Sequence, residues 1–219
     1  MDWAVKPIPY DEVVMDGVER RLTAKGEATR ARIVAAAADL FYERGLRQTS
    51  NEDIRAAAKV SGSQLSHYFP DRESLTRAVL ARRADGAVDP SRFPGGGLPD
   101  SLASLRSWAA TYVARHREGS RGCLVGSLVT EALKSGMPLQ GDAAQAFQQW
   151  EDVLADGFDT MRTHHEIDGD ADPRRLARML LAALQGGLLL AQVTGSADAL
   201  EAALDGVIQV VETESPSRA

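Results

Sequence analysis

Two short stretches of helical pattern, at residues 50–58 and 61–69, follow each other with almost no chain between them. Each opens with the two partners of a capping box, which are Ser50 with Asp53 and Ser61 with Gln64. In the second stretch Leu65 and Phe69 stand four residues apart and share one helix face, while the other side chains are small or polar. Helices this short are not stable alone, so both must pack on a longer element.

A long amphipathic helix is predicted just before them, at residues 23–44. Its apolar stripe has helical spacing, and Gly45 follows where a helix would end; the stripe is Ile33, Ala36, Ala37, Leu40 and Phe41. A further helix is predicted to begin with Asp71 as its cap. Helices in the order long, short, short with a tight turn form a helix-turn-helix, whose second short helix presents its N-terminal residues to base edges in the DNA major groove.

The chemistry of the second short helix fits that role. Small residues at Gly62 and Ser63 allow close backbone approach, Gln64 is able to pair with adenine, and hydroxyl groups and His67 suit phosphates or bases. The pattern alone leaves an alternative open: a polar connector, with Gln64 occupied by its own cap and Tyr68 used for packing.

Charge is unevenly distributed along the chain. Between positions 20 and 83 there are 13 Lys and Arg against 7 Asp and Glu, which leaves 12 against 24 of the chain's 25 and 31 for the rest. A basic segment beside an acidic remainder is typical of a protein in which one part meets a polyanion, although an ordinary solvated surface gives the same count.

The remaining pattern is helical, and β-branched alternation is nearly absent, so the fold class expected is all-α. A segment rich in proline and glycine within 89–100 indicates a boundary. We therefore expect four regions, namely an N-terminal extension at 1–22, a three-helix DNA-binding domain at 23–88, a helical bundle at 89–213 and a disordered tail at 214–219. Bundle helices are predicted near 101–118, 122–135, 141–164, 173–194 and 197–212.

Composition favours a cytoplasmic protein. The single cysteine, Cys123, cannot form an internal disulfide, and the first 20 residues lack the apolar run of a secretory signal. The longest apolar stretch, 176–193, is interrupted by Arg178 and Gln185, so we expect a buried helix and no membrane partner.

Residues 29–75 resemble the DNA-binding domain of the tetracycline-repressor (TetR/AcrR) family of bacterial transcriptional regulators. The resemblance rests on the apolar positions, caps and turn in register, which are Ile33, Ala36, Ala37, Leu40, Phe41, Gly45, Thr49, Ser50, Ile54, Ala58, Val60, Ser61, Leu65, Phe69 and Arg72. It implies base contacts from Gly62 and Ser63. It implies mostly phosphate contacts from Asn51, Ser61, Ser66, His67, Tyr68 and Arg72.

This sequence departs from the family pattern in places. Lys59 stands where a small residue is usual and would need a left-handed backbone conformation, which costs roughly 1 kcal/mol. Ser66 replaces a tyrosine, and Gly62 a basic or small polar residue.

For the second half, the resemblance implies a homodimer through the helices near 173–194 and 197–212, with Gly186 and Gly187 allowing close approach. A near-palindromic double-stranded DNA operator would follow from that two-fold symmetry. It also implies a pocket for an unknown small-molecule effector that releases the protein, most simply a repressor, from DNA. The candidate lining residues are Cys123, Leu124, Leu128, Phe147, Trp150, Leu154, Phe158 and Leu184, each of which is equally open to being ordinary core.

Other functions have weak signals. His164 and His165 are adjacent, so they diverge on a helix and chelate one metal poorly, and His116 is expected at the surface. No phosphate loop, nucleophile elbow or zinc spacing occurs, so we expect no enzyme, no cofactor and no metal. A thiol-based redox response through Cys123 is the alternative regulator, and a helical-bundle enzyme is the alternative from another class.

Overall fold

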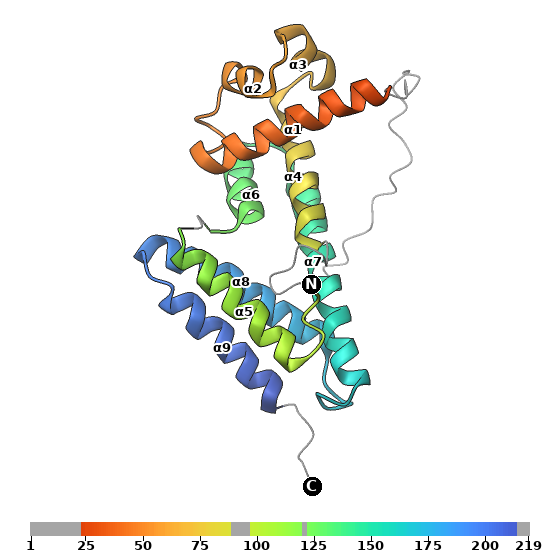
Figure 1. Ribbon diagram of the computed structural model, residues 1–219, viewed down its shortest axis with the longest axis vertical. Helices are drawn as coiled ribbons and strands as arrows, with labels where there is room; N and C mark the ends of the chain where they lie inside the picture. Colours follow the sequence, from red (N-terminus) through yellow and green to blue (C-terminus); the bar gives the residue numbers. More distant parts are fainter. Residues whose placement is uncertain (1–22, 89–96, 120–121, 214–219) are drawn as a thin grey trace, which may run out of the picture.

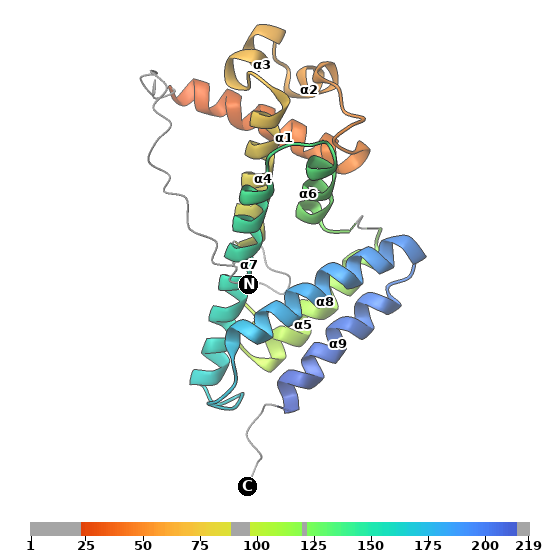
Figure 2. The ribbon, with the colours of Figure 1, turned by 180° about the vertical axis from the view of Figure 1, so that it is seen from behind.

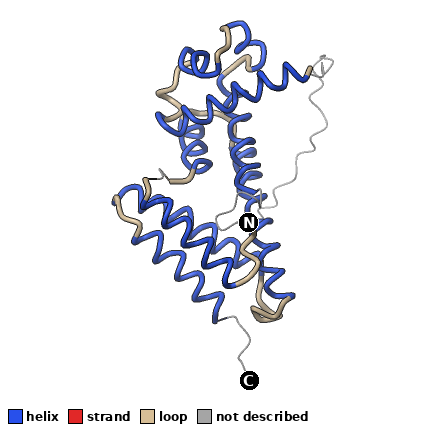
Figure 3. Tube along the Cα trace, in the orientation of Figure 1, coloured by secondary structure: helices blue, strands red, loops and turns tan. Residues whose placement is uncertain are grey.

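The computed structural model describes residues 23–88, 97–119 and 122–213, which are helical with no strand among them (Figure 3). In chain order the helices are α1 (Ala24–Arg44), α2 (Asn51–Ala58), α3 (Gly62–Tyr68), α4 (Arg72–Val88), α5 (Leu102–Arg117), α6 (Leu124–Lys134), α7 (Gln140–Thr163), α8 (Pro173–Thr194) and α9 (Asp198–Thr213). The all-α prediction is confirmed. The expected extension at 1–22, the tail at 214–219 and most of the linker lie outside the described residues.

The helices form two groups joined by long helices. Helices α1, α2 and α3 lie together at one end, and α5, α8 and α9 run side by side at the other (Figures 1 and 2). Helix α4 extends from the first group alongside α7, and α6 lies between the groups next to α1 and α4.

The buried side chains divide into two cores, and the division does not follow the linker. One core contains α5, the second half of α7, α8 and α9. The other contains α1 to α4 together with apolar residues of α6 and the first half of α7, which are Val125, Leu128, Ala132, Leu139, Ala143 and Ala146. Among the described residues, Cys123 and Phe147 contact both cores. Part of the C-terminal region is thus built into the N-terminal unit, which we call the head (α1–α4).

Helices α8 and α9 pack closely because of one glycine. A Cβ placed on Gly187 would lie 2.8 Å from the Cα of Leu200 in α9, a contact that real side chains do not make. Its neighbour Gly186 has no atom within 4 Å of such a Cβ. Of the two glycines expected at a contact between copies, Gly187 serves the packing of its own chain.

The apolar sequence of α8 had indicated a buried helix, but one side of α8 is exposed. Leu189, Leu190 and Val193 are 61%, 53% and 76% exposed, on the side turned away from the core. The helix is also long and apolar enough to meet the length and composition expected of a membrane span, contrary to our reading of its polar interruptions. Its packing against α7 and α9 gives it instead the place of a central bundle helix.

Candidate functional site

Helix α3 is held by its two apolar residues. Leu65 and Phe69 are each 5% exposed and belong to the head core with Ile33, Phe41 and Ile54. The predicted inward anchoring is confirmed. Because these two side chains occupy one face and Tyr68 packs beside them, the remaining polar side chains of the short helix face outward.

The start of α3 is fixed by a reciprocal cap. The Ser61 Oγ accepts the backbone N–H of Gln64 at 3.1 Å, and the Gln64 Oε1 accepts the backbone N–H of Ser61 at 2.9 Å. The predicted capping box is confirmed. Since the cap uses the amide oxygen, the Gln64 side chain retains its N–H donors for other partners.

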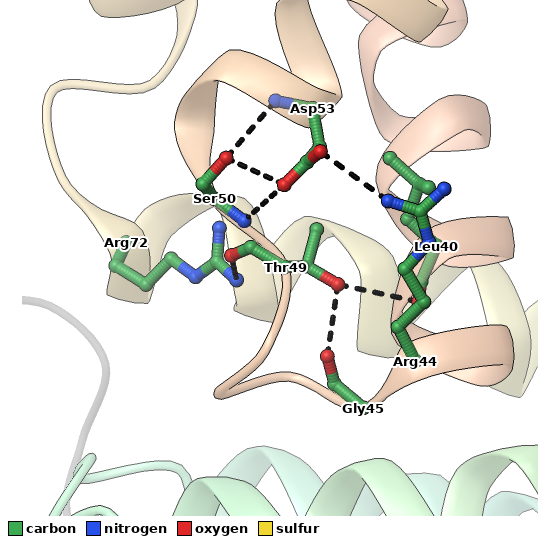
Figure 4. Close-up of polar contacts among 7 residues, drawn as sticks. All are labelled: Leu40, Arg44, Gly45, Thr49, Ser50, Asp53 and Arg72. Atoms are coloured by element: carbon green, nitrogen blue, oxygen red, sulfur yellow. Dashed lines mark hydrogen bonds and ion pairs between the residues drawn. The ribbon is translucent and has the colours of Figure 1, made fainter.

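Helix α2 starts with the same device. Ser50 and Asp53 form the second predicted capping box, and Arg44 of α1 pairs with Asp53 at 3.3 Å (Figure 4). Hydrogen bonds from the Ser50 side chain and then its backbone N–H lower the pKa of Asp53. The carboxylate is therefore ionised at neutral pH and keeps both bonds.

The turn between α2 and α3 has the left-handed residue that the sequence required. Lys59 has φ 53° and ψ 54°, and its backbone N–H reaches the carbonyl groups of Arg55 and Ala56. The Arg32 Nε of α1 donates to the Ala58 carbonyl at 3.1 Å and fastens the turn to the long helix. The helix-turn-helix is thus kept in spite of a lysine at a position that favours glycine.

Most of the predicted DNA-contacting residues are accessible, apart from Arg72. Gly62 and Tyr68 are half-buried, whereas the others are exposed, namely Asn51, Ser61, Ser63, Gln64, Ser66 and His67. The His67 and Tyr68 rings meet edge to face with centroids 5.0 Å apart. A row of hydroxyl, amide and imidazole groups is therefore available on the outer side of α3.

Arg72 is engaged inside the head. One terminal nitrogen donates to the carbonyl group of Thr49 at 2.8 Å (Figure 4) and to that of Leu46 at 2.6 Å. The guanidinium also lies over the Phe41 ring, 4.5 Å from its centroid. Burial lowers its pKa, although an arginine stays charged in proteins. Its geometry is that of a brace between α4 and the loop after α1, and the phosphate contact remains a prediction.

Basic side chains that the residue-by-residue analysis missed also border α3. The Arg30 guanidinium lies over the Phe69 ring at 5.2 Å, and Arg55 lies beside Gly62, where an added Cβ would be 3.6 Å from its Cζ. Exposed Lys59, which the sequence had already singled out in the turn, adds a third positive charge. The positive charge of residues 20–83 was the available signal, but it did not say which residues gather around α3.

The head is also tied to α6 by a carboxylate. The Glu131 Oε2 accepts the backbone N–H of Leu46 at 2.8 Å and that of Arg47 at 3.4 Å. Arg72 holds the same loop from the other side through the Leu46 carbonyl. The loop between α1 and α2 is thus fixed by one group from α6 and one from α4.

The predicted effector residues separate into three places. Trp150, Leu154, Phe158 and Leu184 lie in the C-terminal core, and Phe147 and Cys123 lie where the two cores meet. Leu128 belongs to the head core, where it and Leu124 line a recess with Phe41 and Val79. One pocket lined by all eight residues is therefore not the arrangement seen.

Cys123 and the histidines have local roles. The Cys123 Sγ accepts the backbone N–H of Gly126 at 3.3 Å and caps α6. His164 is the C-cap of α7, and His165 follows with φ 59°. His116, expected at the surface, has its Nδ1 buried without a partner. In the described part of the chain, no cluster of three His, Cys, Asp or Glu side chains is placed to hold a metal ion.

Two family comparisons match most of the chain. Residues 33–79 match the description "Bacterial regulatory proteins, tetR family", and residues 100–207 match "Tetracyclin repressor-like, C-terminal domain".

Known proteins agree with this match. The HTH-type transcriptional repressor DhaR of Mycobacterium sp. (strain GP1) is 24% identical over 188 residues, covering 83% of this chain and 91% of its own. The repressor KstR2 of Rhodococcus jostii is 34% identical over 90 residues, or 41% and 44% of the two chains. The crystal structure of a TetR-family regulator from Cytophaga hutchinsonii superposes with a TM-score of 0.73 at 16% identity, over 90% of this chain and all of that one.

A capped, outward-facing recognition helix on a helical head, joined to a larger helical bundle, defines a helix-turn-helix transcriptional regulator. Such a protein binds operator DNA through the head and carries a C-terminal domain for dimerisation and ligand binding. The chain belongs to the TetR family of DNA-binding transcriptional regulators, a family that is not enzymatic.

Proposed function

We propose that this protein is a homodimeric cytoplasmic repressor that leaves a near-palindromic operator when a small molecule binds its C-terminal domain. The observation that carries the proposal is the outer side of α3, which is polar and accessible because Leu65 and Phe69 occupy the inner side. DhaR and KstR2 are repressors, which supports repression and not activation as the mode of regulation.

The direct test uses the full-length, ligand-free protein and DNA from beside its own gene. We expect sequence-selective retention of a fragment that weakens steeply with salt, because lysine and arginine contacts to phosphate release counterions. Equal retention of unrelated fragments, or none, would remove the operator from the proposal.

The cap of α3 limits which base edge the Gln64 side chain would read. Its Oε1 is occupied by the cap, so in this conformation its N–H groups suit acceptor edges such as guanine O6 and N7 better than the bidentate adenine pairing expected from sequence. Gln64→Ala is expected to change sequence preference by about 1–3 kcal/mol at one base pair. The measurement is fluorescence anisotropy with operator variants substituted one base pair at a time.

Ser61→Ala is the comparison, because it removes the other hydrogen bond of the same capping box and leaves the Gln64 side chain present. If both variants change preference alike, the cap and not the amide determines specificity.

A second copy would cover the exposed apolar side of α8. This side begins with two small exposed residues, Ala182 and Gly186, and continues with Leu189, Leu190 and Val193. The small residues would allow a facing helix to approach closely. A dimer with two-fold symmetry through α8 and α9 would place two α3 helices about one DNA turn apart, roughly 34–36 Å.

Leu189→Lys is expected to weaken the dimer at least about tenfold, because an ammonium group in the centre of an apolar interface loses its hydration. Sedimentation velocity over a concentration series measures this. Leu133→Lys, at the exposed leucine of α6, is the control and is expected to leave association unchanged. Equal dissociation constants for both variants and the parent would place the interface elsewhere.

Signal transfer would run through α6. Its first turn lies at the junction of the two cores with Cys123, and its last turn holds the loop before α2 through Glu131. A ligand that displaces α6 would therefore move α2 and α3, and useful coupling needs about 1–3 kcal/mol of differential affinity.

Glu131→Ala is expected to reduce that coupling several-fold while operator affinity without ligand changes less. The reason is that the loop would keep its ties to Arg72 and, through the Thr49 hydroxyl, to α1, but would lose its tie to α6. Operator release is titrated with effector in parent and variant, with Glu131→Gln as the variant that keeps an acceptor oxygen. Undiminished release by Glu131→Ala would exclude this route.

A further inference from the structure

Unsatisfied donors gather in the C-terminal core. Trp108 in α5 and Trp150 in α7 are 0% and 4% exposed, yet neither indole N–H has an acceptor among the described residues. The Gln185 Nε2 in α8 and the His116 Nδ1 in α5 are also buried and unpartnered. A buried donor without a partner costs about 1–3 kcal/mol, so several in one region indicate an acceptor that the protein itself does not supply.

Several contacts connect part of this set to the start of α6. Trp108, Tyr112 and His116 follow one another at four-residue steps, so they lie along one side of α5, and the rings of Trp108 and Tyr112 have centroids 4.6 Å apart. Burial raises the pKa of the Tyr112 hydroxyl, and so does the nearby Cys123 thiol, which places Tyr112 next to the start of α6.

The other wall of the region is formed by α8 and α7. Gln185 approaches the first turn of α6, where a Cβ added to Gly126 would lie 3.0 Å from its Oε1 and 3.7 Å from the Cys123 Sγ. Trp150 stands one turn after Phe147, which contacts both cores as Cys123 does. Ion pairs of Glu151 and Asp152 with Arg174 and Arg178 hold this part of α7 against α8.

The chemistry of this set selects a ligand class. An indole N–H only donates, so the partner must present acceptor oxygens. None of the four unpartnered groups is a lysine or arginine, and Arg115, which acts on the Tyr112 hydroxyl, is exposed. A buried carboxylate or phosphate would therefore lose hydration without a buried arginine or lysine to offset it. Aromatic rings form much of the surroundings, which suits a flat apolar body.

We propose that α5, α6, α7 and α8 hold an uncharged, largely apolar carbonyl compound, whose oxygens accept hydrogen bonds from Trp108, Trp150 and Gln185. This rests on the proposed function in that the compound would be the effector. The site adjoins the first turn of α6, so its occupant would act on the helix that ends at Glu131.

The test uses the indole N–H signals of the ¹⁵N-labelled full-length protein, which has three tryptophans, Trp3, Trp108 and Trp150. Trp108→Phe and Trp150→Phe assign them. The probes are 1-indanone, 9-fluorenone and flavone as carbonyl compounds, indane and fluorene as their hydrocarbon counterparts, and 9-fluorenone-2-carboxylate as the anionic one. At least one carbonyl probe is expected to move the Trp108 and Trp150 signals downfield and to leave Trp3 in place, while the hydrocarbons and the anion do not.

Gln185→Leu adds a binding measurement. The affinity for the active carbonyl probe is expected to fall about tenfold, the worth of one hydrogen bond, while that for its hydrocarbon counterpart is unchanged or higher. Gln149→Leu, at an exposed position of α7, is the control, and circular dichroism checks that each variant is folded.

The outcomes separate the two proposals. Equal shifts with ketone and hydrocarbon, shifts with the anion only, or no shift with any carbonyl probe up to its solubility would overturn the ligand class. A compound that releases the operator but leaves both indole signals unmoved would also overturn the ligand class, and the repressor function would stand. Indole shifts in a protein that retains no operator would instead overturn the repressor and keep the site.

Discussion

Gly187→Val is expected to separate α8 from α9 and to lower the stability of the C-terminal bundle by about 3 kcal/mol or more. The added Cβ would meet the Leu200 Cα at 2.8 Å and its Cδ1 at 2.9 Å, and a backbone atom cannot rotate away as a side chain can. Leu200 is fully buried, so the strain would reach the centre of the core. Thermal unfolding followed by far-UV circular dichroism measures the loss.

The neighbouring glycine provides the comparison. Gly186→Val makes the same chemical change one residue earlier, where the new Cβ meets no atom within 4 Å. Gly186 lies in the proposed contact between copies, so both glycine variants are compared in the Leu189→Lys background. There the effect of Gly186→Val on the fold is expected to be within about 0.5 kcal/mol, as for ordinary surface substitutions. Similar melting temperatures for the two variants would show that the close contact relaxes at little cost.

Arg72→Ala is expected to destabilise the head by about 2–4 kcal/mol. It removes two hydrogen bonds from a charged donor, worth about 1.5–3 kcal/mol each before compensation by water, and a cation–π contact with Phe41 worth about 0.5–2 kcal/mol. For a chain of this size the melting temperature would fall by roughly 5–15 °C.

This result distinguishes a brace from a phosphate contact. Arg82→Ala, at an exposed arginine of the same helix, is the control for loss of charge and is expected to leave the melting temperature unchanged. If Arg72→Ala keeps its stability and only reduces the salt dependence of DNA binding by about one unit, the sequence-based phosphate role is the right one.

Local chemistry made the head predictable. The two capping boxes and the spacing of Leu65 and Phe69 follow from residues at most four apart. The left-handed Lys59 was expected from the resemblance to the family's turn. The identity of the recognition helix depended on the same short-range signals.

Contacts between residues far apart in the sequence could not be predicted from such local signals. Glu131 and Leu46 are 85 residues apart, and nothing in either neighbourhood marks them as partners. Gly186 and Gly187 have the same sequence environment but face opposite surroundings, because helix rotation is set by packing. The buried indole donors of Trp108 and Trp150 are likewise visible only when the atoms around them are known.

The shared core bears on the construction of hybrid regulators. A splice in the proline- and glycine-rich segment 89–100 would graft the head onto a foreign C-terminal half and strip it of Leu128, Ala132 and Leu139, which fill its interior. A crossover placed within α7, after Ala146, would carry those residues along, but it would need the new partner to meet Phe147. Exchange of DNA specificity between relatives should therefore succeed more readily by rewriting the surface of α3 than by swapping whole modules.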